Sequence, residues 1–189
     1  MNWIIFGLVL IWLGIISWFD LRDKEIPSSL WVIIPLIGAG AYRYWNGGGT
    51  LVALTLMVAI ISERDRLSRL FRFEAIGFLC ACLPILFLCT YINIQSDPLP
   101  TLSILAFWLA WEFKWWGGAD ASTSLTLILI YPEYSFILGF LGIHLLVGLG
   151  LSAQDFINKK SLTFHMVPGL PLLFVSIVFL PMIRMTIKA

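Results

Sequence analysis

Charged residues are scarce in this sequence. Only 12 Lys and Arg and 11 Asp and Glu occur among 189 residues, whereas 60% of the residues are hydrophobic. The mean hydropathy is +0.94. Soluble domains usually carry about a quarter of their residues as charged ones. The composition therefore excludes an ordinary soluble domain and predicts an integral membrane protein.

Metal-binding and redox-active side chains are also few. The chain has three cysteines and two histidines. All three cysteines (Cys80, Cys82 and Cys89) lie in one apolar stretch and no C-x-x-C pair occurs, which argues against a disulfide framework and a zinc site. His144 has no second His or Cys at metal spacing and is interpreted as a helix-packing residue. We expect no metal and no cofactor.

Basic clusters of the kind that bind nucleic acid are missing as well. The net charge is +1, and no basic tail or stripe is present, so we expect no nucleic-acid partner. The first residues, Met1-Asn2-Trp3, lack the basic region that opens a signal peptide, and no small-residue cleavage site follows. We therefore expect the first apolar segment to be retained.

Long apolar segments are what the sequence does contain. They do not alternate in polarity as barrel strands do, and helices are the other structure that satisfies its backbone within lipid. Two of the segments, 50–62 and 121–132, are short for a span of about 20 residues. We therefore predict an all-α polytopic membrane helix bundle with six to eight transmembrane helices, forming a single domain over residues 1–189. The segments lie at about 2–19, 30–45, 50–62, 75–93, 101–116, 121–132, 135–151 and 167–184.

The basic residues are distributed unequally between the loops on the two faces of such a bundle. With eight crossings, one face carries nine of them and the other carries only Arg43, Arg184 and Lys188. The positive-inside rule places the first face in the cytoplasm of a multi-pass plasma-membrane protein and both termini outside. Asp20 and Asp120 then lie on the same, cytoplasmic side. The loops of that face are 20–29, 63–74, 114–120 and 152–166.

Two acids stand directly where an apolar run ends. Trp18-Phe19-Asp20 closes the first segment, and Trp115-Trp116-Gly117-Gly118-Ala119-Asp120 separates two later ones. Acids at such positions are functional candidates, because burying charge near hydrocarbon is costly. Two adjacent carboxylates share one proton, so one can act as a base on water while the other donates to a peptide carbonyl. The glycines would allow close backbone approach to a substrate, or unwinding of the segment beside the acid.

A purely structural interpretation competes with this one at each acid. Asp20 can be a helix-end residue that reaches the headgroups, and Asp120 can cap the next helix. Glu112 similarly has two interpretations, as a modulator of the acid pair or contact for a basic leader, and as a residue with a local partner. The charged run 62–72 fits either a short amphipathic helix at the interface or a solvated loop that sets topology.

Three sequence elements together resemble a known family. Asp20 with Ile26-Pro27 is similar to the D-x5-I-P element of type IV prepilin peptidases and archaeal preflagellin peptidases. Gly117-Gly118-Ala119-Asp120 resembles their G-x-G-D element, with Ala119 in place of the second glycine. Met166-Val167-Pro168-Gly169-Leu170-Pro171 resembles the start of the family's last helix. The three occur in the family's order.

The resemblance implies a membrane aspartyl endopeptidase with Asp20 and Asp120 as its catalytic pair. Its partners would be pilin-like or archaellin-like precursors, whose short basic leader is cut off after a glycine on the cytoplasmic side. Members that also methylate the new terminus usually carry an extra cytoplasmic region, often with C-x-x-C pairs, which this chain lacks. The resemblance thus implies peptidase activity without methyltransferase activity.

Two rival functions use the same residues. A small proton- or cation-coupled transporter would need acids near mid-membrane and polar residues that continue toward the other face. Asp20 and Asp120 instead stand at segment ends. An inactive scaffold that keeps the fold for assembly contacts is the second rival.

Overall fold

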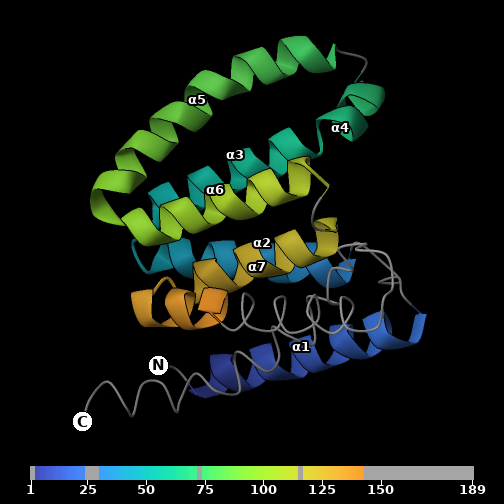
Figure 1. Cartoon of the computed structure of the whole chain (residues 1–189), viewed down its shortest axis with the longest axis vertical. Helices are drawn as coiled ribbons and strands as arrows, with labels where there is room; N and C mark the ends of the chain where they lie inside the picture. Colours follow the sequence, from blue (N-terminus) through green and yellow to red (C-terminus); the bar gives the residue numbers. More distant parts are fainter. Residues whose placement is uncertain (1–2, 24–29, 72–73, 115–116, 143–189) are drawn as a thin grey trace, which may run out of the picture. The chain divides into compact units, whose positions relative to one another are not determined.

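The computed structural model describes residues 3–23, 30–71, 74–114 and 117–142 (Figure 1). Within these ranges the regular structure consists of eight helices, which confirms the all-α prediction. Seven of them are α1 (Trp3–Asp23), α2 (Leu30–Trp45), α3 (Gly49–Ser62), α4 (Arg64–Phe71), α5 (Ala75–Ser96), α6 (Pro98–Glu112) and α7 (Gly118–Ile130). The last helical segment is described over residues 134–142.

The predicted apolar segments correspond closely to these helices. Each of the first six overlaps one helix, and 135–151 is helical over its described residues 135–142. The segment 167–184 lies outside the described residues. One helix, α4, does not correspond to a predicted apolar segment. Its eight residues are helical, which agrees with one of the two interpretations of the charged run 62–72, the short helix, and not with the solvated loop. Its sequence mixes Arg and Asp with Leu67, Leu70 and Phe71, which is typical of a short amphipathic helix.

One helix in the described part of the chain is long and apolar enough to cross a membrane by length and composition. It is the 21-residue stretch Ile76–Ser96 of α5. Three shorter apolar helices span Trp3–Phe19, Gly49–Ser62 and Gly118–Ile130. The six to eight crossings therefore stay a prediction, since a span of about 20 residues is the usual requirement.

The chain forms two compact units, the first of which contains α1. Along α1 the buried residues recur every three or four positions, at Phe6, Val9, Leu13 and Ile16, which is the spacing of one helix face. The indole nitrogen of Trp12 donates a hydrogen bond to the Trp31 carbonyl at 2.8 Å, which fixes the start of α2 to α1. Residues 134–142 belong to this same unit.

The second unit covers Val32–Glu133 and is organised around α3. This helix packs against α5, α6 and α7, and Figure 1 shows α3 and α6 side by side with α5 running in the opposite direction. Leu51, Leu54, Val58 and Ile61 form the buried face of α3. At the start of α3 the amide of Asn93 donates to the Thr50 carbonyl at 2.9 Å, so the end of α5 is tied to it.

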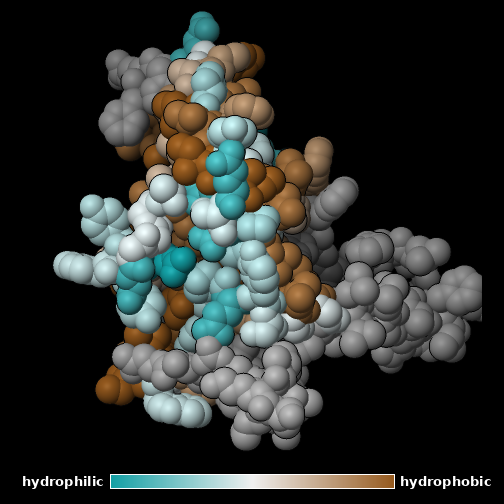
Figure 2. Space-filling model, turned by 90° about the vertical axis from the view of Figure 1, so that its left-hand side faces the viewer, coloured by the Kyte–Doolittle hydropathy of each residue, from teal (hydrophilic) through white to brown (hydrophobic). Residues whose placement is uncertain are grey.

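Much of the surface of the second unit is apolar. Ile76, Phe87 and Leu88 on α5 are 77%, 74% and 57% exposed. Figure 2 shows the face at which α3 and α6 begin, where hydrophilic residues gather in the middle and hydrophobic surface lies on either side of them. Large apolar side chains therefore form part of the exposed surface of this unit, and its place in a membrane stays a prediction.

Candidate active site

Asp120 lies in the first turn of α7. Gly117 immediately precedes this helix and has an extended backbone, with φ −66° and ψ 150°. Its carbonyl accepts a hydrogen bond from the Ala121 amide at 3.1 Å. Asp120 is half-buried, and its own carbonyl accepts the hydroxyl of Ser124 at 2.8 Å. A carboxylate in this position is stabilised by the unpaired amides and the positive end of the helix dipole.

The two glycines of the motif have different surroundings. A Cβ atom on Gly117 would lie 3.4 Å from Oδ2 of Asp120, so the carboxylate is directed back toward the residue that precedes the helix. A Cβ atom on Gly118 would lie 3.2 Å from Nε1 of Trp111. The missing side chain at Gly118 therefore allows Trp111 of α6 to pack closely against α7. The chain is helical from Gly118 onward. Ala119 is half-buried as the second residue of that helix.

The end of α6 supplies the other side of this turn. Phe113 closes the helix through its amide, which donates to the Leu109 carbonyl at 2.9 Å. The next residue, Lys114, has φ +56°, the left-handed conformation that glycine adopts most easily. Its amide donates to the Trp111 carbonyl at 2.9 Å. This reversal directs the chain from α6 toward the start of α7.

Glu112 has a local partner. Nη1 of Arg64 donates to both carboxylate oxygens of Glu112 at 2.8 Å. The Ser62 hydroxyl and the Trp108 indole nitrogen each donate to Oε1 at 3.3 Å. Arg64 also donates to the Ile61 carbonyl at 3.1 Å. Of the two interpretations of Glu112, these contacts favour the structural one, because charge-assisted hydrogen bonds from several directions fix its side chain.

This ion pair also joins two helix ends that are far apart in sequence. Arg64 is the first residue of α4, and Glu112 is the last residue of α6, before the turn that leads to Asp120. The start of α4 and the end of α6 therefore lie at the same end of the second unit. Asp120 stands at this charged end of the helices, and the side of a membrane that the end faces stays a prediction.

Asp20 lies in the last turn of α1, directly after the apolar part of the helix that ends at Phe19. The structure describes the backbone of Asp20 but not its side chain. Asp20 belongs to the first compact unit and Asp120 to the second, so their proximity stays a prediction. Two motif elements, Ile26-Pro27 and Met166–Pro171, fall outside the described residues, as does His144.

Sequence reasoning missed two features beside Asp120. Trp111 contacts the motif itself at Gly118. The hydroxyl residues Thr123, Ser124 and Thr126 are all buried in α7, and within the described part of the chain Oγ1 of Thr123 has no hydrogen-bond partner. In the sequence, the run Ser122-Thr123-Ser124 at the start of an apolar segment was the signal that could have indicated these buried hydroxyl groups. No group of three or more His, Cys, Asp and Glu in the described ranges is placed to hold a metal ion.

Comparison of the chain with protein-family models, with curated proteins and with solved structures gave no match. The resemblance to the prepilin peptidases therefore depends on the three ordered motifs. Of the three motifs, the one at Asp120 lies where the turn between α6 and α7 ends and α7 begins.

Proposed function

We propose that this chain is an integral membrane aspartyl endopeptidase. It removes the short basic leader of pilin-like or archaellin-like precursors at the cytoplasmic face of a multi-pass bundle, and it does not methylate the new terminus. Asp20 and Asp120 form the catalytic pair. The proposal rests on the motif order and on the exposed apolar surface of the helices, which suits a membrane.

The observation that carries the proposal is the placement of Asp120 at the charged end of its helix. Its carboxylate is directed toward Gly117, at the end of the unit that also holds Arg64 and Glu112. In the proposed enzyme, water and an extended peptide would reach Asp120 from outside the bilayer. A transporter acid is instead expected near the middle of a span, where α7 has the hydroxyl residues Thr123, Ser124 and Thr126. This difference favours the peptidase over the transporter.

The two acids would have different roles in the reaction. Asp120 is at the N-terminal end of α7, where the helix dipole favours a carboxylate. Asp20, in the last turn of α1, would be the protonated member of the pair. Asp120 would therefore take the proton from the attacking water. Asp20 would donate a hydrogen bond to the carbonyl oxygen of the scissile peptide.

The test is co-expression with a tagged precursor that bears a basic leader and a glycine at the cleavage site. Wild type is compared with Asp20→Asn and Asp120→Asn by the gel shift of the precursor. Asp97→Asn is the matched control, because Asp97 lies at the opposite end of the second unit, between α5 and α6. We expect cleavage by wild type and by the control, and no cleavage by the other two variants.

Two results would contradict the proposal. Cleavage that survives Asp20→Asn or Asp120→Asn would rule out the acid pair as the catalytic machinery. Failure of wild type to cleave any member of a panel of basic-leader precursors would instead favour the inactive scaffold. Each variant must accumulate in membranes at the wild-type level, so that loss of activity is not loss of protein.

A further inference from the structure

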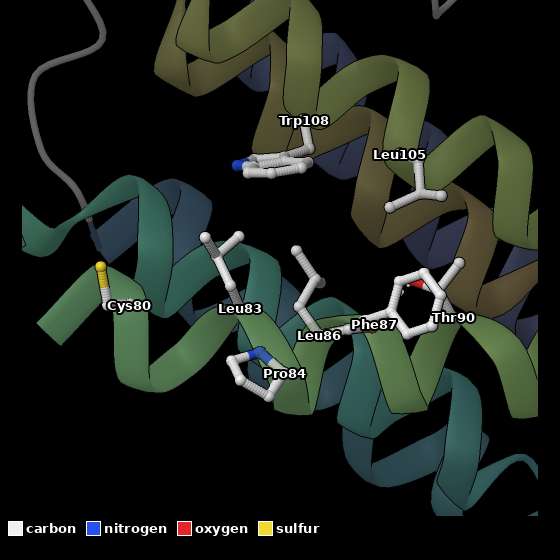
Figure 3. Close-up of a pocket in the computed structure, with 8 residues that line it drawn as sticks. All are labelled: Cys80, Leu83, Pro84, Leu86, Phe87, Thr90, Leu105 and Trp108. Carbon is white, nitrogen blue, oxygen red and sulfur yellow. Dashed lines mark hydrogen bonds between the residues drawn. The ribbon is translucent and has the colours of Figure 1, made fainter.

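The two tryptophans in the last two turns of α6 have different neighbours. Trp108 lines an apolar groove of about 700 Å³ between α5 and α6, and Figure 3 shows leucine side chains of α5 projecting toward its indole ring. Trp111 instead contacts α7, because its indole lies against Gly118. Of these two side chains, Trp111 is therefore the one that links α6 to the helix start that carries Asp120.

The start of α7 lacks the side chain that usually fixes a helix end. The residue before the helix is Gly117, which makes no side-chain hydrogen bond to it, and the first helical residue is Gly118. Glycine is among the least favourable residues inside a helix, because its backbone has the most conformational freedom. Two successive glycines therefore make the backbone before Asp120 dependent on packing from outside the helix.

Trp111 supplies this packing. The edge of its half-buried indole lies so close to the backbone at Gly118 that a Cβ atom there would be 3.2 Å from Nε1. Successive residues of a helix are about 100° apart around its axis, so Asp120 lies about 200° from Gly118. Trp111 therefore supports α7 from the side away from Asp120, and it acts on this acid through the position of the helix.

The backbone of Trp111 is held in place by its own neighbours. The next residue, Glu112, accepts hydrogen bonds from Arg64 at 2.8 Å, which ties the last turn of α6 to the first residue of α4. The Trp111 carbonyl accepts the Lys114 amide at 2.9 Å. The indole thus has a defined position against which Gly118 packs.

We propose that Trp111 is a positioning residue for Asp120, whose indole keeps Gly118 in the helix and thereby fixes the direction of the Asp120 carboxylate. The catalytic consequence rests on the proposed function, whereas the positioning rests on the contact at Gly118. Without the indole edge, the first turn of α7 opens more often, and Asp120 is less often placed to take a proton from water. Misplacement of a reacting group by about 1 Å can cost about 100-fold in rate.

The experiment uses the full chain purified in detergent and three substitutions. Trp111→Phe keeps an aromatic ring but leaves space at Gly118, because a phenyl ring is smaller than an indole. Gly118→Ala adds a methyl group, and the double variant combines the two changes so that the methyl group fills the space. Trp45→Phe is the matched control, because Trp45 is 85% exposed at the end of α2.

Two quantities are measured for each variant. The first is hydrogen exchange of the Ala121 amide, followed by mass spectrometry. This amide donates to the Gly117 carbonyl at 3.1 Å across the first turn of α7, so its exchange reports the opening of that turn. The second is kcat and KM for cleavage of the precursor with a basic leader. A positioning residue affects kcat, whereas a residue that binds the precursor affects KM.

We expect Trp111→Phe to raise the exchange rate at Ala121 and to lower kcat, each by about tenfold, with KM unchanged. Gly118→Ala alone should also lower kcat, because its methyl group displaces the indole. The double variant should recover most of the exchange protection and of kcat. Trp45→Phe should match wild type in both quantities.

Four results would overturn the positioning role. They are unchanged exchange at Ala121 in Trp111→Phe, exchange that rises equally in α3, a wild-type kcat despite faster exchange, and a double variant no better than Trp111→Phe. Equal exchange in α3 would show that Trp111 stabilises the whole unit and not the start of α7. Recovery in the double variant excludes general unfolding as the cause of the loss in Trp111→Phe.

The two measurements also separate this proposal from the proposed function. Wild type that cleaves no precursor, with exchange at Ala121 in the expected order among the variants, would contradict the peptidase and leave the hold of Trp111 on α7 established. Wild type that cleaves the precursor, with Trp111→Phe equal to it in exchange and kcat, would overturn the positioning role alone.

Discussion

Trp111 packs against Gly118 so closely that a Cβ atom there would lie 3.2 Å from Nε1 and 3.3 Å from both Cε2 and Cζ2 of the indole. Trp111 belongs to the last turn of α6, and Gly118 is the first residue of α7. The contact therefore sets the position of the helix start that carries Asp120. Arg64 and Glu112 fix the same turn of α6.

Gly118→Ala should destabilise the protein. The added methyl group forces the indole of Trp111 to shift, and overpacking of this kind typically costs about 1–3 kcal/mol of unfolding free energy. Gly38→Ala is the control, because its Cβ would meet nothing within 4 Å inside α2. That control should be neutral or stabilising by about 0.5–1 kcal/mol. Thermal unfolding in detergent measures both, and equal stabilities of the two variants would contradict the contact.

The Arg64–Glu112 pair should show energetic coupling. The side chains are only 26% and 21% exposed, and both oxygens of Glu112 accept from Arg64. A double-mutant cycle with Arg64→Met and Glu112→Gln should give a coupling free energy of about 1–2 kcal/mol. The matched cycle of Arg66→Met and Glu63→Gln tests an exposed pair 3.9 Å apart and should give about 0–1 kcal/mol. Additive effects at Arg64 and Glu112 would show that the pair does not join the start of α4 to the end of α6.

Lys114→Gly should stabilise the turn between α6 and α7. Lys114 has φ +56°, and the left-handed conformation costs a residue with a Cβ atom about 1–2 kcal/mol that glycine avoids. Lys114→Ala removes the same charge but keeps the Cβ atom, so it isolates the backbone effect. We expect Lys114→Gly to be more stable than Lys114→Ala by about 1 kcal/mol in denaturant unfolding. The opposite order would show that φ at this position is negative in solution.

Reporter fusions should place the two ends of the second unit on opposite sides of the membrane. Alkaline phosphatase fused after Gly47, between α2 and α3, should be active, because the positive-inside rule predicts that end outside. The same enzyme fused after Ser68 in α4 should be inactive, and green fluorescent protein should show the reverse pattern. Phosphatase activity after both residues would contradict the predicted topology. The Ser68 fusion tests the basic face on which Asp120 is expected.

Most helix positions were predictable from local pattern. Apolar runs interrupted by Asn46-Gly47-Gly48 and by Asp97-Pro98 predict helices that end at those turns, and the structure has them there. The partner of Glu112 was not predictable. Arg64 is 48 residues away in sequence, and no periodic pattern connects residues in different helices. The contact of Trp111 with Gly118 was not predictable from the sequence either, because it depends on the angle at which the chain reverses at Lys114.

The sequence by itself determined the apolar composition, the helical segments, the predicted side of each loop and the two acids at segment ends. These properties follow from hydrophobicity, charge and short-range backbone preferences, which are local. Only the tertiary structure decided that the start of α4 and the end of α6 meet through Arg64 and Glu112. It also decided that Trp111 positions the start of α7, and that α5 and α6 leave an apolar groove open between them. Packing between helices fixes these features, because it depends on which side chains meet across long separations in the chain.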